Sequence, residues 1–206
     1  MTGKIKTLIE AGKALLMARE TYKEAFVLWH EDVELLPPDR FWELFEVYAK
    51  LFWKREDAKW AADEFARQAL CKEGDYTLEE VASFAKNWAE LVRALSKALW
   101  DKITEGYSDD SWSDFTDMLP HAGRKVCAMI LDGKIGTVET LKDSFFEHHT
   151  EFQPHHTGKV RLGRDRMEII LHGEHYNQMM LRDAVASYIT SWCGGQDETE
   201  AEPKLV

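Results

Sequence analysis

The sequence predicts a predominantly α-helical α+β protein, in which a helical, bundle-like body precedes a small unit with one β-hairpin packed on helices. Apolar residues recur at three- and four-residue spacing over most of the chain, as in amphipathic helices. Residues that cap or stop helices separate these stretches. Only residues 159–171 alternate apolar and charged side chains in the manner of half-buried strands.

The composition indicates a globular protein with an aromatic core. At 206 residues the chain is long enough for one domain, or for one domain with a small appendage. Hydrophobic residues make up 45% and charged residues 31%, which is typical of folded rather than disordered chains. Eight tryptophans indicate a core rich in large rings.

The predicted helical body covers residues 1–118. A first helix runs from about residue 4 into the low thirties and ends before Pro37-Pro38. Asp39 is a suitable N-cap for an apolar pattern that continues from Phe41 to Leu70 and stops at Gly74. Thr77-Leu-Glu-Glu80 forms a capping-box motif. The helix that it opens has the most regular stripe of the chain: Val81, Phe84, Trp88, Leu91, Leu95 and Leu99. Ser111 can cap a short helix before Pro120.

The predicted second unit covers residues 119–193. It contains helices over 122–131 and from Thr137 to His148, and a last helix that Gly194-Gly195 stop. Between them, Lys159–Gly163 and Arg166–Leu171 flank a Gly163-Arg-Asp turn, so a hairpin is expected over about 159–172. Residues 194–206 are acidic and poor in large apolar residues, which predicts a disordered tail.

Charge and cysteine content narrow the classes of function. The net charge is −11, and most of the excess of acids lies in residues 1–118, which argues against broad nucleic-acid binding. The three cysteines form neither a CxxC pair nor a disulfide framework. No signal-peptide pattern or membrane-spanning run is visible, so a cytoplasmic protein is expected.

The stretch from residue 148 to residue 175 contains six of the eight histidines and predicts a candidate metal site. Imidazoles together with a carboxylate suit Zn²⁺ or another divalent metal, which would make the protein a metal-dependent hydrolase. The established spacings, such as HExxH, are absent, and adjacent histidines generally point apart. The candidate ligands are His148, His155, His172, Glu174 and His175.

The same stretch contains the one strongly basic patch of the sequence: Lys159, Arg161, Arg164 and Arg166. Four bases on a hairpin can contact phosphates or nucleic acid. The alternative, which we prefer, is that these side chains pair with the acidic body or lie in solvent on an exposed strand.

No coherent catalytic set is visible in the sequence. Nucleophile-elbow, Walker and GxGxxG motifs are absent. Cys127 follows cationic residues that can lower a thiol pKa, although a buried and inert cysteine is the commoner outcome. We therefore expect a non-catalytic protein that binds another protein, as an inhibitor, adaptor or assembly component, and no cofactor. A phage or mobile-element accessory protein that acts on a nucleic-acid-binding enzyme fits this description.

Overall fold

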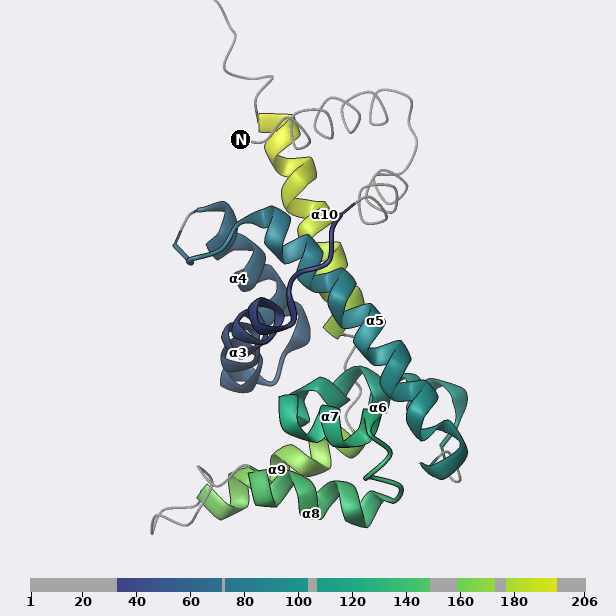
Figure 1. Cartoon of the computed structure of the whole chain (residues 1–206). Helices are drawn as coiled ribbons and strands as arrows, with labels where there is room; N and C mark the ends of the chain where they lie inside the picture. The colour runs from purple at the N-terminus through teal and green to yellow at the C-terminus, as the bar shows by residue number, and fades with distance from the viewer. Residues whose placement is uncertain (1–32, 72, 104–106, 149–158, 173–176, 196–206) are drawn as a thin grey trace, which may run out of the picture. The chain divides into compact units, whose positions relative to one another are not determined.

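The computed structural model describes residues 33–71, 73–103, 107–148, 159–172 and 177–195. Within these residues the chain forms eight α-helices and one short 3-10 helix, and no β-strand (Figure 1). The helices are α3 (Pro38–Arg55), α4 (Ala58–Leu70), α5 (Leu78–Ile103), α6 (Asp109–Met118), η1 (Leu119–Ala122), α7 (Arg124–Leu131), α8 (Val138–His148), α9 (Lys159–His172) and α10 (Asn177–Gly195). The described part of the protein is therefore all-α.

The chain divides into two compact units, and the division falls inside α5. The first unit contains α3, α4, α5 up to Lys86, and α10 from Met179. The second unit contains the rest of α5 and α6 to α9. The boundary expected from the sequence, between residues 118 and 119, lies inside the second unit, where α6 passes into η1.

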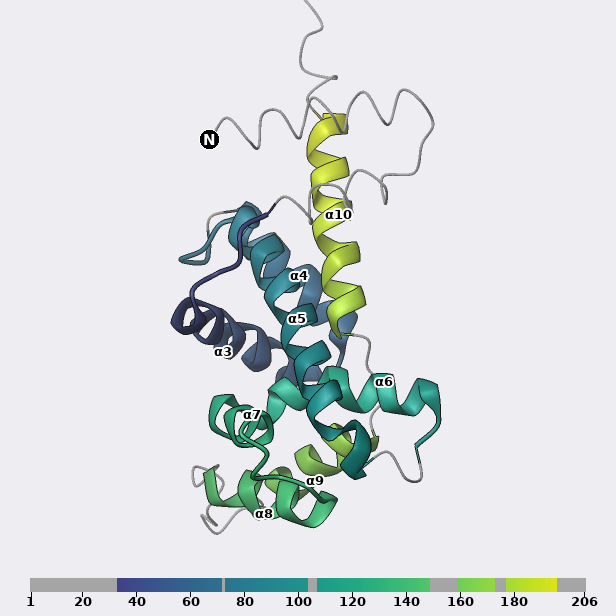
Figure 2. The ribbon, with the colours of Figure 1, turned by 45° about the vertical axis from the view of Figure 1, so that its right-hand side comes forward.

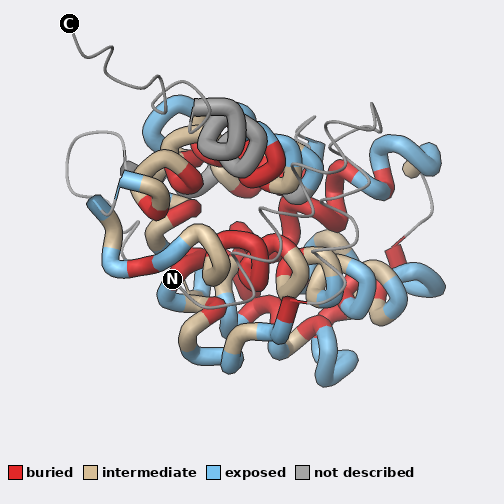
Figure 3. Tube along the Cα trace, turned by 90° about the horizontal axis from the view of Figure 1, so that it is seen from above, coloured by how far each residue is buried: buried red, intermediate tan, exposed pale blue. Residues whose placement is uncertain are grey.

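The core of the first unit is built around Phe84. Its ring centroid is 5.2 Å from that of Phe41, 6.1 Å from that of Tyr48 and 5.3 Å from that of Phe65. The buried face of α4 consists mainly of alanines, which let α3 and α4 pack closely. Along the described helices, buried and exposed residues alternate in the way that amphipathic patterns predict (Figure 3).

The start of α5 confirms the capping box predicted at Thr77. The Glu80 amide donates to the Thr77 hydroxyl at 3.2 Å, and the Thr77 amide donates to the Glu80 carboxylate at 2.9 Å. The same carboxylate accepts from Nε of Arg40 on α3 at 2.8 Å, and Arg40 also donates to the carbonyl of Asp75. These bonds attach the beginning of α5 to α3.

The second unit packs α6 against α9 and η1, and α7 against α8 and η1 (Figure 2). Trp88 of α5 is fully buried, and its indole N–H donates to the carbonyl of Asp117 at 3.3 Å. Each helix contributes a buried stripe to this core. Its buried members include Leu95, Leu99, Phe115, Met118, Val126, Ile130, Leu141, Phe145, Met167, Ile170 and Leu171.

The β-hairpin predicted over about 159–172 is wrong, because these residues form the single helix α9. Met167, Ile170 and Leu171 are buried, while Glu168 and His172 are exposed, which is the spacing of one helical face. A short run of apolar and charged residues fits a strand and a helix equally well. The contacts of this buried face with α6, η1 and α8 stabilise the helix rather than a hairpin.

Several predicted helix ends also differ from the structure. The pattern from Phe41 to Leu70 is interrupted at Glu56, which has a φ of 53°, so two helices form instead of one. Ser108, rather than Ser111, is the N-cap of α6, and the two residues form a capping box. The helix predicted near residues 4–33 lies, except for Val33, outside the described residues, as does the predicted tail beyond Gly195. No helix in the described ranges is long and apolar enough to span a membrane.

Candidate functional site

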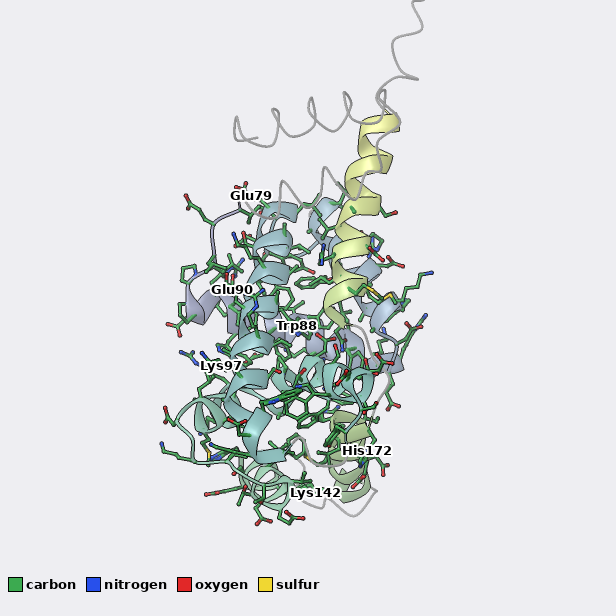
Figure 4. All side chains as sticks on the ribbon, turned by 90° about the vertical axis from the view of Figure 1, so that its right-hand side faces the viewer. Glu79, Trp88, Glu90, Lys97, Lys142 and His172 are labelled. Atoms are coloured by element: carbon green, nitrogen blue, oxygen red, sulfur yellow. The ribbon has the colours of Figure 1, made fainter. Side chains whose placement is uncertain are left out.

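The predicted metal ligands are only partly within the described structure. His148 ends α8 and is half-exposed, and His172 ends α9 and is exposed. His155, Glu174 and His175 lie outside the described residues. Figure 4 labels His172, together with Lys142 of the neighbouring α8.

The two predicted histidine ligands that the structure describes, His148 and His172, do not lie close together. α8 and α9 run antiparallel (Figures 1 and 2), and their register is fixed by Lys142, whose Nζ is 3.6 Å from the Glu168 carboxylate. In this register His148 and His172 are at opposite ends of the pair, about 15 Å apart along the helix axes at 1.5 Å per residue. Within the described part of the chain, no three histidine, cysteine or acidic side chains are arranged to hold a metal ion.

The four predicted phosphate-contacting bases all belong to α9. The side chain of Arg166 is half-exposed. Lys159, Arg161 and Arg164 are described only in their backbone. With about 100° between successive residues, the helix places positions 161 and 164 on one side and positions 159 and 166 on nearly the opposite side. A helix therefore divides this set, whereas a hairpin face would have gathered it.

The structure instead brings together an aromatic group at the junction of α5 and α6, which we call the Trp100 cluster: Trp100, Tyr107, Trp112 and Phe115. Trp100 meets Trp112 edge to face, with 5.4 Å between ring centroids. Phe115 lies 5.5 Å from Trp112 and stacks on Tyr107 at 5.1 Å. The four rings form one continuous contact set within the second unit.

Hydrogen bonds and helix capping fix the position of the Trp100 cluster. The indole N–H of Trp112 donates to the hydroxyl of Ser96 on α5 at 2.9 Å. The Ser108 hydroxyl accepts the Ser111 amide and so starts α6 one turn before Trp112. Burial raises the pKa of the Tyr107 phenol, so this ring stays neutral. Three of the four rings, Trp100, Trp112 and Phe115, therefore stand on helices, and Tyr107 lies in the connection between α5 and α6.

Trp100 differs from the other members of the cluster in its exposure. It is 49% exposed, whereas Trp112 is 6% and Phe115 is 1% exposed. The reason is its place on α5: the buried stripe runs through Leu99 and Ile103, and Trp100 lies about 100° further round the helix than Leu99. A large apolar ring on rigid support and half open to solvent is typical of a protein-binding surface.

This site was not predicted from the sequence, although a signal for it is present. The stripe through Leu95 and Leu99 was identified as the buried face of the helix, and Trp100 lies off that face. A tryptophan outside the buried stripe of a regular helix is a candidate for an exposed ring. What the sequence did not provide was the contact with Trp112, which depends on the angle between α5 and α6.

The chain matches no protein-family model, and it resembles no curated protein and no solved structure. Its function therefore has to be inferred from its own residues.

Proposed function

We propose that the protein is a non-catalytic binding protein, an inhibitor, adaptor or assembly component, and that the Trp100 cluster contacts its protein partner. The observation that carries this proposal is the half-exposed Trp100 ring, held edge to face on the buried Trp112. Neither a cofactor nor a metal is part of the proposal.

The energetics of a tryptophan suit this role. About half of its surface, on the order of 100 Å², is still open to water, and its burial by a partner would contribute about 2 kcal/mol. Because the ring already contacts Trp112 and the helix is formed, little side-chain freedom is lost on binding. Tryptophan is also among the residues most enriched at the energetic centres of interfaces.

The test is to isolate the partner by co-purification from the native host and then to measure its affinity for purified variants. We expect Trp100→Ser to weaken binding at least about tenfold, in keeping with a loss of about 2 kcal/mol. Leu131→Ser is the matched control, because Leu131 belongs to the same unit and is 48% exposed. Thermal unfolding should confirm that both variants are folded.

Two results would contradict the proposal. One is a partner affinity that stays within about twofold of the original in the Trp100→Ser variant. The other is an equal loss in the Leu131→Ser variant, which would mean that general surface hydrophobicity, rather than the Trp100 cluster, drives the association.

A further inference from the structure

The turn between α3 and α4 carries a second surface, in the first unit, which we call the α3–α4 corner. Its members are Lys50, Trp53, Lys54, Arg55, Lys59 and Trp60. The four bases are exposed, and the two tryptophans are half-buried. The same turn contains two exposed acids, Glu56 and Asp57, so the four bases leave a local excess of positive charge beside two aromatic rings in a chain with a net charge of −11.

The shape of the turn brings two cations to one indole ring. Glu56 adopts the left-handed conformation, and the Asp57 carboxylate caps α4 by accepting the Trp60 amide at 2.9 Å. As a result, the Arg55 guanidinium lies 4.2 Å from the centroid of Trp60, and the Lys54 ammonium lies 5.7 Å from it. The ring attracts both cations, while the cations repel each other. An anion placed beside them would relieve this repulsion.

The cations of the corner differ from Arg40 and Arg67 of the same unit in their partners. Arg40 is paired with Glu43 and Glu80, and Arg67 is paired with Glu64 and Glu73. Among the described residues, by contrast, no carboxylate lies within ion-pair distance of the four bases of the corner. Lys54 and Lys59 act at longer range on Glu64 and Asp63 of α4, but none of the four bases is held in a close ion pair that a ligand would have to displace.

We infer that the α3–α4 corner binds an acidic, extended segment of a partner protein. A guanidinium that lies over an aromatic ring still has N–H groups that can donate to a carboxylate in a bidentate manner. Lys50 and Lys54 are one helical turn apart on α3, so they can meet further carboxylates along such a segment. The half-buried rings of Trp53 and Trp60 supply apolar contact between the charges.

A protein segment fits this surface better than a nucleic acid does. Arg55 already lies over Trp60, and stacking of a base would need that ring to be open. Trp53 contacts Phe52 at 4.9 Å, which takes up part of its ring as well. A long phosphate chain would also extend beyond the corner over a protein of net charge −11, whereas a short acidic segment would not.

The experiment measures fluorescence anisotropy of a fluorescein-labelled octaglutamate peptide titrated with the full chain, at about 50 mM and about 300 mM salt. A labelled single-stranded oligothymidine is titrated in parallel. The test variant is Lys54→Glu/Arg55→Glu. The control is Lys97→Glu/Lys125→Glu, which changes the net charge equally at two exposed lysines of the second unit. Lys97 is labelled in Figure 4.

We expect the original chain to bind octaglutamate, more weakly at the higher salt concentration. The corner variant should lose at least about tenfold in affinity, and the control should stay within about twofold. Absence of octaglutamate binding, or equal loss in both variants, would overturn the inference. Tighter binding of oligothymidine than of octaglutamate would overturn it in favour of nucleic acid. Because the Trp100 cluster lies in the other unit, these results are independent of the test of that cluster.

Discussion

At the scale of single residues, Cys127 illustrates how burial controls side-chain chemistry. It lies on the buried side of α7, and its Sγ is 3.6 Å from the carbonyl oxygen of Leu119. Burial raises the pKa of this thiol, because the thiolate would lose its hydration. The neighbouring cations, Arg124 and Lys125, are on the exposed side of the helix. They do not supply the activation that their closeness in sequence suggested.

Thiol labelling should therefore distinguish Cys127 from Cys71, which is exposed. In a Cys193→Ser background, we expect one thiol to react rapidly with a disulfide reagent in the native protein, and mass spectrometry should identify it as Cys71. Cys127 should react at least about a hundredfold more slowly until denaturant is added, since only the thiolate is nucleophilic. Rapid native labelling of Cys127 would contradict its placement in the core.

The spacing of apolar residues predicted which positions are buried more accurately than the grouping of histidines predicted a metal site. Of the stripe predicted for α5, Leu91 is only half-buried, and the other members are buried as their spacing indicated: Val81, Phe84, Trp88, Leu95 and Leu99. The histidine set was chosen because its members are close in sequence. In the structure, however, His148 and His172 are separated by the antiparallel arrangement of α8 and α9. Proximity of functional groups depends on how helices pair, which composition does not report.

At the scale of elements, the break between α3 and α4 was missed because the apolar pattern continues across it. Trp53 and Trp60 are seven residues apart, which is the spacing of one helical face, so the apolar pattern continues in the sequence although α3 ends between them. The break places Glu56 in the left-handed region, which costs about 1–2 kcal/mol for a residue with a side chain. The packing of α3 on α4 offsets this cost, and a local sequence pattern does not contain that contact.

The cap at Asp57 should contribute measurably to the stability of this turn. Its carboxylate accepts the Trp60 amide at 2.9 Å and satisfies one of the unpaired amides at the start of α4. We expect Asp57→Ala to lower the free energy of unfolding by about 1 kcal/mol, and Asp57→Ser to have a smaller effect, because serine also caps helices. Urea denaturation followed by circular dichroism provides the measurement. Equal stability of the Ala and Ser variants would contradict this role of Asp57.

The helix α9 shows a second limit at this scale. Lys159–Leu162 alternates charged and apolar residues over four positions, too few to separate a period of two from one of 3.6. Gly163 then resembled a turn residue, yet it lies within the helix. The later residues Met167, Ile170 and Leu171 already had helical spacing. These three residues share one buried helical face, and that spacing identifies the segment as a helix.

At the scale of the whole molecule, the predominance of helix was predictable from periodicity and capping residues, whereas the division of the chain was not. The predicted boundary separated a helical body from a unit with a β-hairpin. The two compact units instead divide within α5, and α10 belongs to the first unit from Met179 on. Contacts between segments that are distant in sequence define such units, and the order of predicted elements along the chain does not contain them.

The acidity of the molecule makes its carboxylate networks important for its response to pH. On α4, the Glu64 carboxylate accepts from Nε and Nη2 of Arg67 at 2.9 and 2.8 Å, and from the Gln68 amide at 2.8 Å. Arg67 also donates to Glu73 beyond the end of the helix. The hydrogen bonds from Arg67 lower the pKa of Glu64 from 4.5 to about 2, and they lower the pKa of Glu73 as well.

A carboxylate whose pKa is lower in the folded than in the unfolded chain stabilises the fold above its unfolded pKa and loses this contribution as the pH falls. The contribution of Glu64 should therefore be complete above pH 4.5 and disappear towards about pH 2. Arg67→Gln removes the cation, so we expect this variant to unfold at a lower urea concentration than the original chain at neutral pH. The difference between the urea midpoints of the two proteins should shrink as the pH falls from 4.5 and should be absent near pH 2.

The control variant is Arg93→Gln, at an exposed arginine of α5, whose urea midpoint should not show this pH-dependent difference from the original chain. If the Arg67→Gln variant is less stable by the same amount at every pH, the arginine acts through packing rather than through the ionised carboxylates.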